Sequence, residues 1–63
     1  MRFSPKQFVV VTLFGLNYRG RVVRNILEPS GDWLYDVQYA DDTGELKRSE
    51  FLEDELVEAG EKP

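Results

Sequence analysis

The sequence contains no cysteine and no histidine. These absences exclude disulfides, thiolate chemistry, zinc-finger spacing and any general base that is a histidine. The 63 residues provide material for one domain, which on folding buries only about 60% of the surface of the unfolded chain. We therefore predict a single domain over residues 1–63, with a frayed end at 60–63. In so small a domain we expect no enzyme, no metal site and no cofactor.

Positive charge is scarce after the first 27 residues. The chain has 8 basic and 12 acidic side chains, for a net charge of −4. Residues 1–27 hold five of the basic side chains and no acid, whereas residues 28–63 hold the other three with all 12 acids, or −9. The net charge argues against a generic polyanion binder. The asymmetry fits either cross-strand ion pairs within the domain or a bipolar surface that docks onto another protein or a second copy.

No apolar stretch is long enough to span a bilayer, which takes about 20 residues. The most apolar stretch, residues 8–16 (FVVVTLFGL), follows two basic residues, as the core of a signal peptide does. No small-x-small cleavage site comes after it, and its β-branched residues favour a strand. We therefore expect a soluble, cytoplasmic protein.

Turn-forming residues divide the chain into short segments. Four strands are predicted, at residues 8–13, 18–27, 33–40 and 45–49. Gly20 marks a bend or a close backbone approach within the second of them. Residues 51–57 fit either an amphipathic helical turn or a 3₁₀ turn that leads into a fifth strand at 56–58. Five short strands at this spacing indicate a small, strongly bent barrel.

Four stretches of the chain carry a resemblance to a known fold: residues 3–11 (FSPKQFVVV), 18–23 (YRGRVV), 35–42 (YDVQYADD) and 51–56 (FLEDEL). They resemble SH3-like barrels of the Tudor and KOW kind. The first two stretches are similar to the first two strands of that fold, and the other two resemble its third strand and its closing turn. The chain departs at Lys6 and Gln7, where the family usually carries Gly-Asp. The resemblance implies an all-β, five-stranded SH3-like (Tudor/KOW-like) barrel with a short helical or 3₁₀ turn near the C-terminus.

Alternation along the strands predicts which side chains face the core. The expected core consists of Val9, Val11, Val22, Ile26, Tyr35, Val37, Tyr39, Leu46, Phe51 and Leu56. Phe8 and Val10 then point outward, on a strand that has no polar face. Such a strand has to be covered on both sides, either by a second copy of the chain or by Phe3 or residues 52–59.

Outward apolar side chains predict a surface that binds another protein or forms a homodimer. The contact candidates are Phe8, Val10, Phe14, Leu16, Tyr18 and Leu34. The resemblance to Tudor domains also raises the hypothesis of an aromatic cage that binds a methylated side chain. The cage would consist of Phe14, Tyr18, Tyr39 and an acid of the turn at 41–42. The aromatic residue that often follows the first Asp of that turn is replaced by Asp42.

The alternative function is nucleic-acid binding of the KOW kind. Arg19 and Arg21 share one face of the second strand, and Arg24 follows closely. Together with Tyr18 they would contact phosphates and stack on a base. The nine net negative charges of residues 28–63 oppose this interpretation, because they repel a phosphate backbone.

Overall fold

The computed structural model describes residues 2–59 and contains five strands and one short helix. The strands are β1 (Phe8–Leu13), β2 (Leu16–Leu27), β3 (Trp33–Ala40), β4 (Leu46–Leu52) and β5 (Leu56–Glu58), and the 3₁₀ helix η1 (Glu53–Glu55) precedes β5. All paired strands are antiparallel. The all-β class and the 3₁₀ alternative for the last segment are thereby confirmed. The end at 60–63 that was predicted to fray lies outside the described residues.

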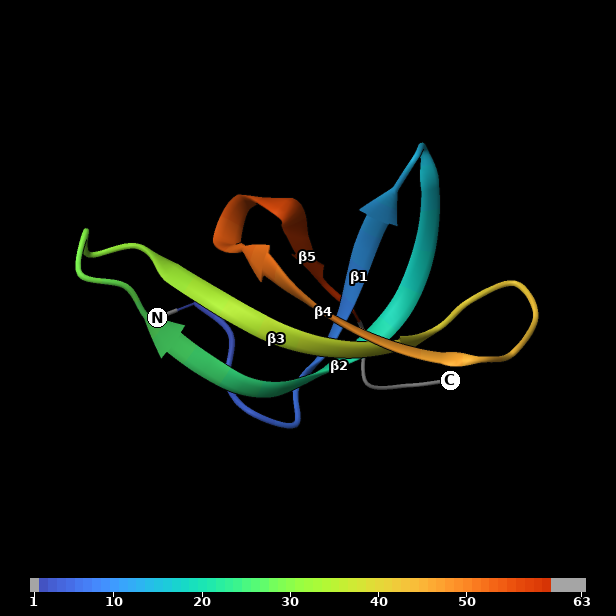
Figure 1. Ribbon diagram of the computed structural model, residues 1–63, viewed down its shortest axis with the longest axis horizontal. Coiled ribbons are helices and arrows are strands. Elements are labelled where there is room, and N and C mark those ends of the chain that lie inside the picture. The colour runs from blue at the N-terminus through green and yellow to red at the C-terminus, as the bar shows by residue number, and fades with distance from the viewer. Residues whose placement is uncertain (1, 60–63) are drawn as a thin grey trace.

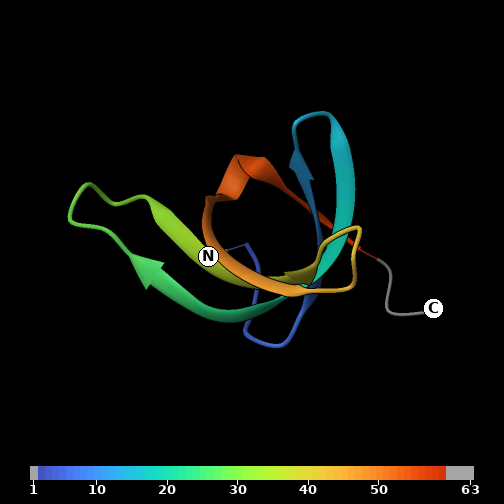
Figure 2. The ribbon, with the colours of Figure 1, turned by 45° about the vertical axis from the view of Figure 1, so that its right-hand side comes forward.

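The five strands form one curled sheet in the order β4-β3-β2-β1-β5. In Figure 1, β1 and the start of β2 stand upright, whereas the rest of β2 runs with β3 and β4 across the molecule. The view in Figure 2 shows the same curl from a second side. The sheet is not closed, because within residues 2–59 no ladder joins the edge strands β4 and β5. Over the same residues, the chain forms no helix with the length and apolar character that crossing a membrane requires.

The curled sheet has two arms, which we call the β1 arm (β1 with the start of β2) and the β3 arm (the end of β2 with β3 and β4). Strand β2 runs through both of them. Its first part pairs with β1 and its last part with β3, and the two registers overlap at Gly20 and Arg21. A Cβ atom on Gly20 would lie 2.7 Å from Cγ1 of Val37 and 2.9 Å from the carbonyl oxygen of Gln38. Both distances are shorter than van der Waals contact, so only glycine fits. The close backbone approach predicted at this position is confirmed.

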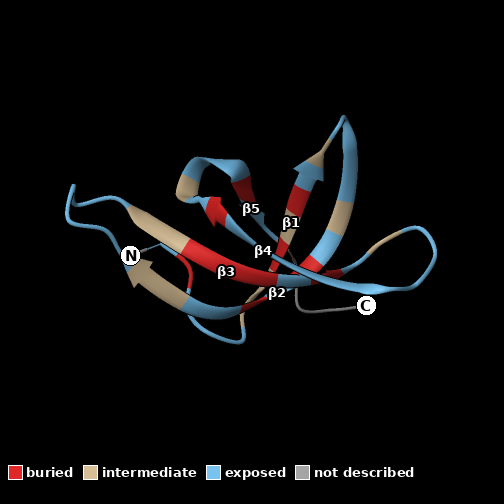
Figure 3. Ribbon diagram, in the orientation of Figure 1, coloured by how far each residue is buried: buried red, intermediate tan, exposed pale blue. Residues whose placement is uncertain are grey.

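The core lies inside the curl and draws on every strand (Figure 3). Its buried apolar residues are Phe3, Val9, Val11, Val22, Tyr35, Val37, Tyr39, Phe51 and Leu56. Eight of the ten predicted core residues are therefore buried. The prediction was wrong for Ile26 and Leu46, and it left out Phe3.

Ile26 is only half-buried because β2 contains a bulge. Val22 faces inward opposite Val37, but the register shifts by one residue between Val22 and Arg24. After the shift, Ile26 pairs with Leu34 on the outer face of the sheet. A bulge of this kind reverses the alternation of all the residues that follow it in the strand.

Leu46 was predicted to point inward, but 64% of it is exposed. Tyr35 pairs with Phe51 and Ala40 pairs with Leu46. Leu46 and Phe51 are five residues apart on one regular strand, so they point to opposite faces. Because Phe51 fills the core, Leu46 has to lie outside.

Phe3 is buried because the segment before β1 is tied to Tyr35. The ring of Phe3 meets the ring of Tyr35 edge to face, with centroids 5.2 Å apart. The Tyr35 hydroxyl accepts the backbone N–H of Arg2 at 3.0 Å and donates to the Glu53 carboxylate at 2.6 Å. These bonds join the start of the chain to η1, and they place Phe3 inside the curl instead of over the outer face of β1.

Replacing Phe51 by Ala should lower the free energy of unfolding by about 3–5 kcal/mol, because the ring leaves a cavity in a small core. Leu46→Ala is the matched control on the same strand, and it should change stability by less than about 0.5 kcal/mol. Urea unfolding followed by tryptophan fluorescence measures both values. Equal losses for the two variants would show that the inside and outside of β4 are assigned wrongly.

Candidate functional site

The outer face of β1 carries the first candidate surface. Phe8 lies opposite Arg21 in β2, and Val10 lies between Arg19 in β2 and Val57 in β5. Residues directly opposite one another in a sheet project from the same face. Phe8, Val10, Val57, Arg19 and Arg21 therefore share one surface, which we call the Phe8 face. Phe8 and Val10 point outward, as the alternation predicted.

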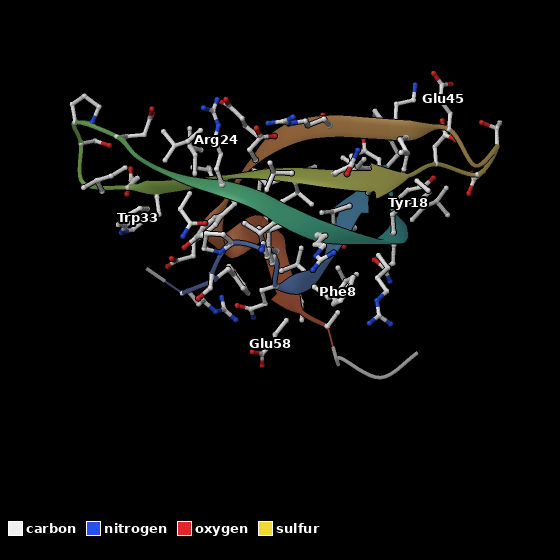
Figure 4. All side chains as sticks on the ribbon, turned by 90° about the horizontal axis from the view of Figure 1, so that it is seen from below. Phe8, Tyr18, Arg24, Trp33, Glu45 and Glu58 are labelled. Carbon is white, nitrogen blue, oxygen red and sulfur yellow. The ribbon has the colours of Figure 1, made fainter. Side chains whose placement is uncertain are left out.

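Two guanidinium groups lie near the ring of Phe8, a residue that Figure 4 labels. The Cζ atom of Arg19 lies 4.8 Å from the ring centroid and that of Arg21 lies 5.1 Å from it. Nε of Arg21 also donates to the carbonyl oxygen of Lys6 at 3.0 Å. At such distances the cations are attracted to the electron-rich face of the ring. The arginines thus leave Phe8 half-buried within a positively charged surface.

A groove of about 820 Å³ adjoins the Phe8 face, between residues 4–8 and the end of β5. Phe8 and Ala59 supply apolar lining, and Lys6 adds a cation at the rim. Glu58 is the acid in this lining, and its carboxylate accepts a hydrogen bond from the Gln7 side chain at 3.1 Å. The groove therefore adds a lining of mixed character, with one cation and one acid, beside the Phe8 face.

The other predicted contact residues lie elsewhere. Phe14 forms a two-residue turn with Gly15 between β1 and β2, at φ values of 52° and 79°, and its side chain is fully exposed. Leu16 and Tyr18 lie opposite Leu13 and Val11, on the inner face. Leu34 lies on the outer face of the β3 arm, opposite Ile26 and Leu52. The six predicted residues therefore do not form one surface.

The residues of the aromatic cage come together only in part. The rings of Tyr18 and Tyr39 are 5.9 Å apart, and the Tyr18 hydroxyl donates to Asp42 at 3.2 Å. Partial burial and this carboxylate raise the pKa of Tyr18. Tyr39, however, is buried in the core, and Phe14 is too exposed to pack against the pair.

Arg24 belongs to a separate ion cluster around Asp36. Arg48 holds the Asp36 carboxylate with two nitrogens, at 3.0 and 2.8 Å, and Nε of Arg24 lies 3.4 Å from it. Hydrogen bonds from Arg48, together with the charge of Arg24, lower the pKa of Asp36. Asp36 is buried although it occupies an outward position of β3, because the arginines cover it. The cross-strand ion pairs that the charge asymmetry predicted are present here, but the sequence did not identify Asp36 as their meeting point, because nothing local indicates it.

Comparison with known proteins gives no relative for the chain. No family model matches it, and no match is found among characterised proteins or solved structures. Among residues 2–59, no three acidic side chains are grouped in a way that could hold a metal ion. Only the surfaces of the molecule itself therefore indicate a function.

The Asp36 cluster predicts how stability depends on pH. The pKa of Asp36 in the folded protein lies below its ordinary value of 3.8, so its contribution to stability is complete above about pH 5 and is lost as pH falls through the folded value. Asp36→Asn should therefore destabilise the protein at pH 6 and reduce the further loss between pH 5 and pH 3.

Urea unfolding at several pH values measures this dependence, with Glu45→Gln, at an exposed position before β4, as the control. The control should follow the wild-type curve. Identical pH dependence for the wild type and Asp36→Asn would contradict the role assigned to the cluster.

Proposed function

We propose that the chain is a small, non-enzymatic SH3-like barrel of the Tudor/KOW kind that works in the cytoplasm and binds another protein. The barrel assignment is supported by the strand order, in which β5 returns beside β1 after a 3₁₀ turn. It is also supported by Lys6, whose φ of 74° is a conformation that glycine adopts readily. Lys6 stands where the resembling barrels usually carry that glycine, so the chain keeps the turn and adds a cation.

The Phe8 face carries the proposal, because within residues 2–59 no other strand or helix lies across the outer side of β1, where Phe8 and Val10 are half-buried. Phe3 is buried inside, and β5 lies beside β1 in the sheet instead of across it. Val57 is 59% exposed next to Val10. An apolar centre that includes an aromatic and is flanked by arginines is the composition enriched in protein interfaces. The charges favour a partner that presents acidic side chains beside an apolar anchor.

Nucleic-acid binding is the second candidate, because Arg19 and Arg21 flank an aromatic ring. Such a group can contact phosphates and stack on a base of a single strand. Arg24, the third predicted contact, is engaged with Asp36 instead. The acidic remainder of the chain also opposes a polyanion, so we rank this candidate below a protein partner.

Site-specific cross-linking in the native host tests both candidates. A photo-reactive amino acid at Val10 should trap a protein partner, because that position lies in the centre of the Phe8 face. The same amino acid at Thr43, in the exposed β3–β4 turn, is the control and should trap none. Replacing both Arg19 and Arg21 by Gln should reduce the product at Val10 by about tenfold or more, as loss of about 1.4 kcal/mol would.

The nature of the trapped molecule decides between the candidates. A protein product supports the proposed function. A product that nuclease removes supports the nucleic-acid alternative. Equal yields at Val10 and Thr43 would contradict a docking role for the Phe8 face.

A further inference from the structure

A second groove lies near the far end of the β2–β3 hairpin. It has a volume of about 420 Å³ and is formed by the start of β3, the turn before it, the end of β4 and η1. Its apolar lining is Trp33 and Leu52, and its charged lining is Arg2, Asp32, Glu53 and Asp54. We call it the Trp33 groove. In Figure 4, Trp33 lies well away from Phe8.

The Trp33 groove combines an aromatic wall with an excess of negative charge. Trp33 packs against the core, and Leu52 is 44% exposed. The hydrogen bond from the Tyr35 hydroxyl and that from the Arg2 backbone lower the pKa of Glu53. The lining thus contains three carboxylates and one cation. The cation is Arg2, whose guanidinium lies 5.0 Å from the Phe3 ring centroid. This lining suits an incoming cation with an apolar neighbour.

The Phe8 face has the opposite chemistry. Lys6, Arg19 and Arg21 surround its apolar centre, with Glu58 as the acid lining the adjoining groove. One surface thus presents cations beside apolar side chains, and the other presents carboxylates beside an aromatic ring. Both surfaces are built on the same small sheet, so one copy cannot bring its own two surfaces together.

We propose that the Trp33 groove binds the Phe8 face of a second copy of the chain. This inference rests on the proposed function and names the partner of the Phe8 face. The two contacting surfaces differ, so the association is head to tail, and each pair keeps one free groove and one free face. Assemblies then grow beyond the dimer as concentration rises. Added salt weakens them, because it screens the charges at the rims of both surfaces.

Two variants that remove charge separate the two halves of the contact. The face variant carries Arg19→Gln and Arg21→Gln, and the groove variant carries Asp32→Asn and Asp54→Asn. A charge-matched control carries Glu45→Gln and Glu50→Gln, which lie in neither surface. Circular dichroism and melting temperature establish that each variant is folded. Sedimentation velocity is then measured for each protein, and for an equimolar mixture of the face and groove variants, from about 10 to 300 µM, the range of weak association.

The wild type and the control should associate beyond the dimer, whereas each variant alone should associate at least about tenfold more weakly. The mixture should form dimers and stop there, because it offers one intact face to one intact groove. If the groove variant associates as strongly as the wild type, the Trp33 groove does not bind the second copy. The inference then fails, whereas the proposed function of the Phe8 face is unaffected. If the wild type and the mixture both stay monomeric, self-association fails, and cross-linking at Val10 still decides the proposed function.

Discussion

The close approach of β2 to β3 at Gly20 is the constraint on which the other features of this fold depend. Gly20 and Arg21 are the residues at which β2 pairs with both of its neighbours. The backbone there lies so near Val37 and Gln38 that a single methyl group would overlap them. A glycine at this point lets one sheet curl over itself and enclose a core. Within residues 2–59, no second layer covers that core, so the curl of the single sheet has to enclose it.

The curl gives β1 its two different roles. Val9 and Val11 fill the core, while Phe8 and Val10 are left on an outer face that nothing else in residues 2–59 lies across. Some of the charges form ion pairs within the domain, chiefly Arg24 and Arg48 with Asp36. Arginines lie around Phe8, whereas acidic side chains predominate around Trp33. The small size of the domain thus connects its fold to its proposed binding: the side chains that it cannot cover internally are available to a partner.

Local patterns predicted the elements better than the contacts between them. The bounds of β1 and β3 and the glycine at the crossing followed from β-branched residues, alternation and turn residues. Ile26 was misplaced because a bulge reversed the alternation, and Leu46 because its direction follows from cross-strand register. Phe3 was missed because its burial depends on Tyr35 and η1, more than 30 residues away. The outward direction of Phe8 was predictable, because it follows from alternation along one strand. Its position beside two arginines and its separation from the other contact candidates were not, because they depend on the pairing of distant strands.

The effect of Gly20→Ala on stability tests the central constraint most directly. In an ordinary strand, alanine is more stable than glycine by roughly 0.5–1 kcal/mol. At this crossing, the added methyl group overlaps Val37 and Gln38, so we predict that Gly20→Ala lowers the free energy of unfolding by about 1–3 kcal/mol. Combined with Val37→Ala, which removes the nearest atom, the loss should be smaller than the sum of the two single losses. An unchanged or increased stability of Gly20→Ala would contradict the account.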